Sequence, residues 1–161
     1  MSSLSVELSS LQQSDYSDVN TIYKAVIEEC RIFLSKKAIR DEELHDTLKL
    51  ESFEHYVDNQ SSFVALVDNK QIVGFILTKE IDWINNQSKT LWLEFIGVSP
   101  NYRRNSIGLK LLEEAKKYAL DHYLDFLYMT LNIDNEPSKN LPIKADFTVR
   151  DWRIAHLAIE N

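Results

Sequence analysis

Apolar and polar residues alternate or recur along most of the chain, and their spacing predicts an order of helices and strands. Residues 4–8 alternate between the two kinds, which is typical of a short strand. Apolar side chains then recur at helical spacing up to about Phe33, and Ser14 or Asp15 can cap this helix. Further helices are expected from about Asp41 and, after a cap at Ser52, through Val57.

The second half of the chain reads as strands that meet at turns and then alternate with helices. Two apolar runs, 63–67 and 71–81, flank the polar turn Asp68-Asn69-Lys70 and predict a hairpin. Downstream we expect a strand over 90–98, a loop over 99–105, a helix over 107–122, a strand over 125–133, a helix over 138–145 and a strand-like segment over 147–159. Hairpins combined with a strand–helix–strand crossover imply a mixed sheet with helices on both faces.

Composition narrows the class of protein to which the chain can belong. The chain has 161 residues, of which 44% are hydrophobic and 27% charged, so we expect one globular domain spanning 1–161. The longest apolar run, 72–77, is far too short for a membrane span, and with Lys24 as the first basic residue we expect no signal peptide. The single cysteine, Cys30, excludes an internal disulfide and fits a reducing, cytoplasmic compartment.

The charge balance argues against a nucleic-acid partner. The formal net charge is −7, from 18 Lys and Arg against 25 Asp and Glu, and no Lys/Arg-rich run occurs. The four histidines show no metal-ligand spacing, so no metal is expected.

Candidate chemistry is concentrated between Glu94 and Leu109, where a strand ends, a polar loop follows and a helix begins. Two of the three glycines of the chain, Gly97 and Gly108, lie here. The first turn of a helix has backbone N–H groups without internal partners, and they attract anions. Gly108 would let the backbone approach an anion closely, and Arg103 and Arg104 would add charge-assisted hydrogen bonds. The loop is therefore suited to a phosphate or diphosphate, although it is neither a Walker loop nor a dinucleotide fingerprint.

This segment resembles the signature of the GNAT superfamily of acyl-coenzyme A-dependent N-acyltransferases. The signature Arg/Gln-x-x-Gly-x-Gly/Ala reads here Arg103-Arg104-Asn105-Ser106-Ile107-Gly108. A second family stretch, which starts at an Asn and ends at a Phe, is visible in weakened form from Asn135 to Phe147. The resemblance implies a mixed, mostly antiparallel α/β sheet, flanked by helices on both faces and splayed between the fourth and fifth strands.

The resemblance also implies roles for individual residues. Acetyl-CoA would be the acyl donor and a small-molecule or peptide amine the acceptor, with the amine attacking the thioester directly through a tetrahedral intermediate. The Val98 backbone N–H would stabilise the oxyanion. The coenzyme-binding residues would be Ile96, Gly97, Val98, Arg103, Arg104, Asn105, Ser106, Ile107, Gly108, Leu109, Asn135 and Ser138.

Three departures from the family pattern bear on the chemistry. Ser106 replaces the first loop glycine; a serine can adopt helical angles there, and its hydroxyl could cap the helix or touch a phosphate. Pro142 stands where the family often has a tyrosine proposed as the general acid, so the acid is unknown. Asp146 replaces a glycine before Phe147, a change expected to affect only a turn.

Glu94 is the candidate general base. An alkylammonium with a pKa near 10.4 loses its proton at pH 7 at a cost of about 4–5 kcal/mol, which a carboxylate would reduce. The alternative is a strand glutamate paired with a neighbour such as Lys79. Tyr128 is a conceivable substitute acid, although a packed aromatic explains it as well.

Two functional alternatives stay open at this point. Ser106 and Pro142 also fit a GNAT-fold module that binds a coenzyme or a protein without turnover, and the loop alone would accept a nucleotide. The acidic residues Glu28, Glu29 and 41–43 could attract a cationic acceptor or simply form a solvated helix face. The sequence does not identify the acceptor, and an exposed terminal strand can pair across a homodimer.

Overall fold

The computed structural model describes residues 4–36, 47–68, 70–84, 88–131 and 135–150. Their elements in chain order are β1 (Val6–Ser10), a 3-10 turn (Gln13–Asp15), α1 (Tyr16–Lys36), α2 (Leu50–Asp58), β2 (Phe63–Val67), β3 (Gln71–Ile84), β4 (Ser88–Val98), a 3-10 turn (Pro100–Tyr102), α3 (Ile107–Asp121), β5 (Phe126–Met129) and α4 (Glu136–Lys144).

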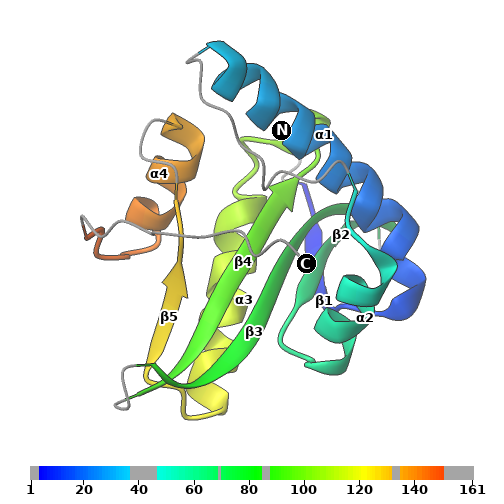
Figure 1. The fold of residues 1–161 in the computed structure, drawn as a ribbon. Helices are drawn as coiled ribbons and strands as arrows, with labels where there is room; N and C mark the ends of the chain where they lie inside the picture. Colours follow the sequence, from blue (N-terminus) through cyan, green and yellow to red (C-terminus); the bar gives the residue numbers. More distant parts are fainter. Residues whose placement is uncertain (1–3, 37–46, 69, 85–87, 132–134, 151–161) are drawn as a thin grey trace, which may run out of the picture.

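Within the described residues the strands form one sheet in the order β1-β2-β3-β4-β5 (Figure 1). β1 to β4 pair antiparallel, whereas β5 runs parallel to β4 after the α3 crossover. This is the mixed, mostly antiparallel sheet that the sequence predicts.

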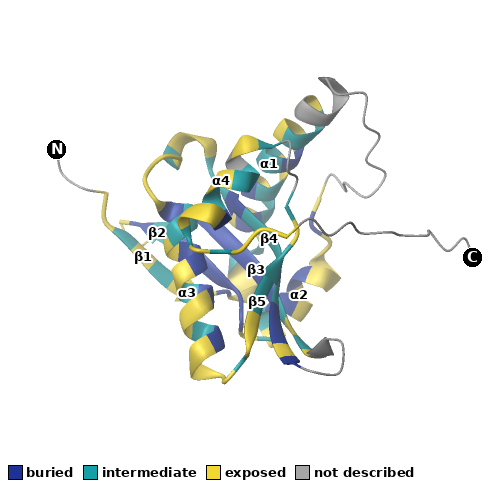
Figure 2. Cartoon of the chain, turned by 90° about the vertical axis from the view of Figure 1, so that its left-hand side faces the viewer, coloured by how far each residue is buried: buried dark blue, intermediate teal, exposed yellow. Residues whose placement is uncertain are grey.

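Helices cover both faces of the sheet, and each face has its own apolar core (Figure 2). On one face α1 and α2 pack on Val64, Phe75 and Leu77. On the other, α3 packs on alternate residues of the same strands, such as Ala65 and Ile76. The alternation follows from strand geometry, in which successive side chains point to opposite faces.

Most element boundaries agree with the sequence prediction, and the exceptions have local causes. Ser52 does not cap α2: the helix begins earlier, with Lys49 at the N-cap. Asp15 accepts a hydrogen bond from the Gln12 backbone N–H at 2.8 Å, so it closes the turn before α1. The strand expected over 147–159 is not found in residues 147–150, and its remainder and the helix near Asp41 lie outside the described residues. No helix of the described ranges is long and apolar enough to cross a membrane.

Candidate functional site

β4 continues past its partner β5, and this opens the sheet beside the predicted loop. β5 pairs with β4 only from Thr90 to Leu93, so on that side the last five residues of β4 have no strand neighbour among the described residues (Figure 1). The opposite edge of β4 stays paired with β3 as far as Val98. The splay between the fourth and fifth strands is therefore present.

Hydrogen-bond alternation along β4 determines which backbone groups face this opening. The Ser99 N–H donates to the Val73 carbonyl at 2.8 Å, so the Gly74–Val98 pair is of the non-hydrogen-bonded type. The N–H and C=O of Val98 consequently point away from β3, and those of Ile96, two residues earlier, do the same. Ile96 and Val98 are thus oriented as a strand-like partner for an extended ligand.

Gly97 has a different role from the one expected. By the same alternation its N–H and C=O point toward β3 and pair with Phe75. A Cβ on Gly97 would lie 2.8 Å from Cε1 of Phe75, so the residue is glycine because the ring of Phe75 packs directly on its backbone.

The loop between β4 and α3 holds two residues in the left-handed region, Arg104 with φ 63° and Ser106 with φ 59°. The expectation that Ser106 takes helical angles is therefore wrong, and its hydroxyl makes no capping hydrogen bond. A glycine adopts this conformation without steric cost, which explains why the family pattern has one here. Within the described residues, no hydrogen bond is found for the N–H groups of residues 106–109, so the first turn of α3 keeps free donors.

Gly108 lies close to α4, a contact that the sequence does not show. A Cβ there would lie 3.1 Å from Cδ2 of Leu141, so the missing side chain makes room for α4. Ile107 is buried in the core under α3, and Leu109 is half-buried. Because both side chains are apolar, these residues can contribute only backbone N–H groups to the binding of an anion.

Two of the polar side chains in the loop already make hydrogen bonds to other groups of the protein. Arg103 donates from Nε to the Val98 carbonyl at 3.2 Å and pairs through Nη1 with Glu29 of α1 at 2.6 Å. Asn105 donates to the carbonyls of Tyr102 and Arg103, so its amide holds the turn together. The guanidinium of Arg104 is exposed, and no described residue pairs with it.

Glu94 lies at an irregularity of β4 that sets the direction of its side chain. The register skips from Leu77–Phe95 to Thr78–Leu93, so Glu94 is the extra residue of a bulge. One carboxylate oxygen accepts a hydrogen bond from the hydroxyl of Tyr56 in α2, and the other pairs with the ammonium of Lys79 on β3. The carboxylate therefore faces the α1/α2 side of the sheet, and the pairing with Lys79 expected as the alternative is present.

Further aromatic residues lie on the same side of the sheet as this carboxylate. Tyr23 of α1 packs on Phe95 with 4.7 Å between ring centroids, and Phe95 stacks on Phe75. Burial raises the pKa of Tyr56 above its ordinary value, and the hydrogen bond to Glu94 raises it further. Burial also raises the pKa of Tyr23. Both phenols are therefore neutral donors at physiological pH.

α4 carries the second stretch of the family pattern. Asn135 is its N-cap residue and makes no side-chain cap hydrogen bond, and Ser138 is half-buried in the first turn. Pro142 is buried inside the helix and offers no proton donor. Asp146 adopts φ 63° just after the helix, where the Asp146 and Phe147 N–H groups donate back to Ile143 and Pro142. This is a Schellman ending, and glycine is the usual residue at its left-handed position.

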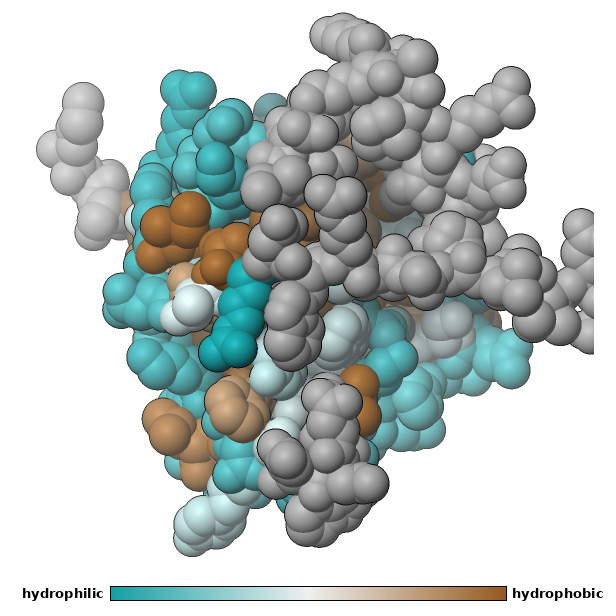
Figure 3. All heavy atoms as spheres, turned by 60° about the vertical axis from the view of Figure 1, so that its left-hand side comes forward, coloured by the Kyte–Doolittle hydropathy of each residue, from teal (hydrophilic) through white to brown (hydrophobic). Residues whose placement is uncertain are grey.

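The face that carries β5 and α4 shows apolar atoms among hydrophilic ones (Figure 3). Phe126 of β5 is 50% exposed and stacks on Tyr128, with ring centroids 5.5 Å apart. Tyr128 itself is half-buried, and no described contact joins it to Glu94.

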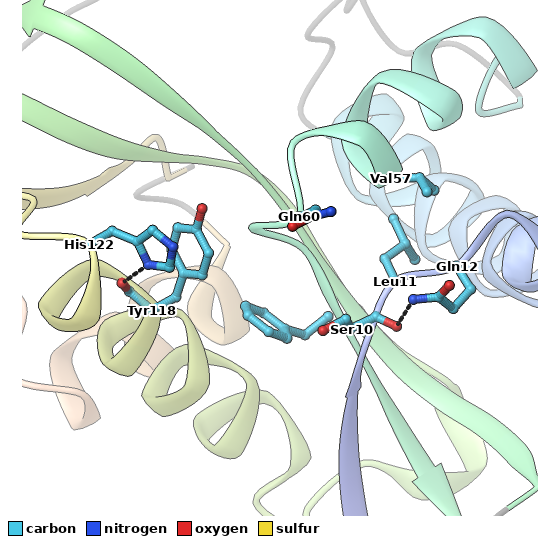
Figure 4. Close-up of a pocket in the computed structure, with 8 residues that line it drawn as sticks. Ser10, Leu11, Gln12, Val57, Gln60, Tyr118 and His122 are labelled. Carbon is cyan, nitrogen blue, oxygen red and sulfur yellow. Dashed lines mark hydrogen bonds between the residues drawn. The ribbon is translucent and has the colours of Figure 1, made fainter.

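A separate pocket of about 490 Å³, drawn in Figure 4, lies beside the C-terminal end of α3, whereas the loop precedes the start of that helix. Its walls come from the end of β1, from α2 and the turn after it, and from the end of α3, with Ser10, Gln60, Tyr118 and His122 among them. None of the loop residues lines it, so the pocket is not the site described above. Among the described residues no group of His, Cys, Asp or Glu is arranged to hold a metal ion.

Tyr56 was not found by sequence reasoning, and Glu29 was expected only as one of several acidic residues that could attract a cationic acceptor, not as the partner of Arg103. Tyr56 and Glu29 lie in helices 38 and 74 positions from their partners Glu94 and Arg103. Tyr56 sits at helical spacing from the buried Phe53, so its pattern is that of a core residue. Glu29 is one of several acidic residues on α1, and only the folded arrangement distinguishes it. Residues 41–43 lie outside the described ranges.

A comparison with family models matches residues 20–147 to the acetyltransferase (GNAT) family. The match covers most of the chain and includes both the loop and α4. No curated protein sequence is detectably similar to this chain.

Solved structures share the fold over nearly the whole chain. A mutant of the BH1408 protein from Bacillus halodurans superposes with a TM-score of 0.74 at 16% identity, over 95% of this chain and 99% of that one. Ribosomal-protein-alanine N-acetyltransferase from Brucella melitensis gives 0.70 at 14% identity, over 97% and 100%. The aminoglycoside N-acetyltransferase AAC(6')-Iy in complex with CoA gives 0.68 at 12% identity, over 96% and 95%.

Proposed function

Because the chain belongs to the acetyltransferase (GNAT) family, we propose that it transfers an acetyl group from acetyl-CoA to a primary amine. The observation that carries the proposal is the open edge of β4 at Ile96 and Val98, directly before a loop and helix start with free N–H donors. An extended ligand with an anionic end fits this arrangement.

The residues present suit the parts of the coenzyme. The N–H groups of residues 106–109 and the guanidinium of Arg104 would hold the diphosphate, because a helix start and a free arginine both favour anions. The backbone of Ile96 and the carbonyl of Val98 would pair with the pantetheine amides, which leaves the Val98 N–H for the oxyanion. Arg103 would join the diphosphate only by exchanging its carboxylate partner Glu29, and Asn135 and Ser138 would lie alongside at the start of α4.

The chemistry would then be direct attack. The amine nitrogen bonds to the thioester carbonyl carbon, giving a tetrahedral adduct whose oxyanion accepts from the Val98 N–H. Collapse breaks the carbon–sulfur bond, and the amine gives up its proton to Glu94 directly or through a water. Pro142 leaves no acid at the family position, but a thiolate with a pKa near 8.5 leaves without prior protonation. Most of the acceleration would come from holding amine and thioester together.

Release of free coenzyme A thiol across a panel of amines tests this function. Turnover that requires an amine, and that falls by about 10²-fold or more in Glu94→Gln, is expected for a general base. The second candidate is a module that binds the coenzyme without turnover, which the buried Pro142 favours. Binding of acetyl-CoA with no thiol release over a broad panel would identify that module instead.

A further inference from the structure

The carboxylate of Glu94 is held between one buried and one accessible partner. Tyr56, which is 9% exposed, occupies one oxygen from the side of α2. Lys79 occupies the other, and the side chains of Lys79 and Glu94 are 35% and 27% exposed. A molecule from solvent can therefore contact the ammonium of Lys79 and the carboxylate of Glu94 side by side. The carboxylate is held in place by its hydrogen bond from the buried Tyr56.

This pair is electrically neutral, and that changes which amines it favours. A simple alkylammonium gains little from Glu94 while Lys79 neutralises it, and displacing Lys79 would leave two cations competing for one carboxylate. An acceptor that carries its own carboxylate avoids this competition. Its ammonium can contact Glu94 while its carboxylate contacts Lys79, so that charges of opposite sign alternate.

We propose that the acceptor is an amino acid or an equivalent zwitterion, with a carboxylate one or two carbons from the amine, and that Lys79 binds this carboxylate. The inference rests on the proposed function and names its substrate class. Amine and carboxylate must be this close because Lys79 and Glu94 are in direct contact. Loss of the amine proton to Glu94 leaves the amine free to attack while Lys79 keeps the molecule in place.

The surroundings of the pair suggest which amino acids to use as probes. Tyr23 and Phe95 form an aromatic wall on the same side of the sheet, and Phe95 follows Glu94 directly in β4. An apolar side chain can pack against this wall. Leucine and phenylalanine are therefore suitable probes, with glutamate added for contrast.

The test compares matched acceptors in the full chain by release of free coenzyme A thiol. Each set contains the amino acid, its amide and its decarboxylated amine, for example leucine, leucinamide and 3-methylbutylamine. We expect kcat/KM for the amino acid to exceed that for both analogues by at least tenfold. In Lys79→Gln this ratio should fall toward one, and in Lys79→Arg it should largely return.

Lys116→Gln is the matched control, since it removes the same charge from an exposed position on α3 and should leave the ratio unchanged. A thermal shift with acetyl-CoA shows that Lys79→Gln still folds and binds the coenzyme. Equal or faster turnover of the amides or amines, or a ratio that survives in Lys79→Gln, would overturn this inference and leave the proposed function intact. Absence of turnover with every acceptor, despite coenzyme binding, would overturn both.

Discussion

Arg103 in the β4–α3 loop is bound to Glu29 of α1, with 2.6 Å between Nη1 and Oε2. The two side chains are 40% and 47% exposed, so water screens the pair and its contribution to stability is at most about 1 kcal/mol. The contact nevertheless joins the predicted diphosphate loop to α1. A diphosphate that recruits Arg103 has to compete with Glu29.

Removing the competitor should tighten coenzyme binding. In Glu29→Gln, Arg103 loses its carboxylate partner and keeps its hydrogen bond to the Val98 carbonyl. We expect the Kd for acetyl-CoA to fall about two- to fivefold, which corresponds to the free energy of an exposed ion pair. Isothermal titration calorimetry measures the change. Glu28→Gln, at the neighbouring exposed position, changes the net charge equally and should have a smaller effect. A Kd that does not decrease in Glu29→Gln relative to Glu28→Gln would mean that Arg103 takes no part in binding.

Ser106 and Asp146 both replace family glycines, and both adopt positive φ, at 59° and 63°. Restoring glycine should relieve a backbone cost of about 1 kcal/mol at each position. We expect Ser106→Gly and Asp146→Gly each to raise the free energy of unfolding by up to that amount in urea denaturation. Ser106→Ala keeps a Cβ at the same φ, so it should bring no comparable gain. Equal effects of glycine and alanine would show that the gain does not come from the backbone.

Gly97 should tolerate no side chain, although its backbone angles are those of an ordinary strand residue. A Cβ would lie 2.8 Å from a ring carbon of the fully buried Phe75. We expect Gly97→Ala to lower the free energy of unfolding by about 1–3 kcal/mol through overpacking. In a background of Phe75→Leu the same change should cost less, because the smaller side chain leaves room. A double-mutant cycle measures this coupling, and strictly additive effects would refute the contact.

The local features of this fold could be predicted from the sequence, because they depend on short-range patterns. The apolar run 63–67 before a polar turn and the helical spacing after Ile107 placed β2 and α3 close to their observed bounds. The opening after Leu93 was expected from the family resemblance, and the register of β5 confirms it.

The features that could not be predicted arise where distant segments meet. The bulge at Glu94 depends on the register with β3, which no pattern within β4 specifies. The absence of a side chain at Gly108 makes room for Leu141, 33 positions away, and no pattern around the glycine indicates this contact. The left-handed φ of Ser106 is likewise imposed by the loop, against the preference of serine.

The raised pKa of Tyr118 should make the free energy of unfolding fall at alkaline pH. Burial, and then its 2.8 Å hydrogen bond to Glu80, raise the pKa of this phenol from 10.0 to about 12. Below pH 10 both folded and unfolded chains keep the proton, so the contribution to stability is complete. Above that pH the unfolded chain loses its proton first, and the free energy of unfolding falls until the pH reaches about 12.

Urea denaturation between about pH 9 and pH 12 measures this fall. In Tyr118→Phe the slope in this range should be smaller, because the half-buried phenol that is bound to Glu80 no longer contributes. Tyr123→Phe, at a phenol that is 90% exposed, is the comparison variant. A slope that is the same in Tyr118→Phe as in the unaltered chain would contradict the prediction.

The central claim is that the start of α3 and Arg104 hold the diphosphate of acetyl-CoA, and calorimetric titration of the full chain with acetyl-CoA tests it most directly. We predict saturable binding that, at 100 times Kd, stabilises the fold by about 2.7 kcal/mol. Arg104→Glu should weaken binding at least tenfold, since an ionic hydrogen bond contributes about 1.5–3 kcal/mol, whereas Lys116→Glu on the far part of α3 should not. No binding at millimolar acetyl-CoA, or equal affinity in Arg104→Glu, would contradict the account.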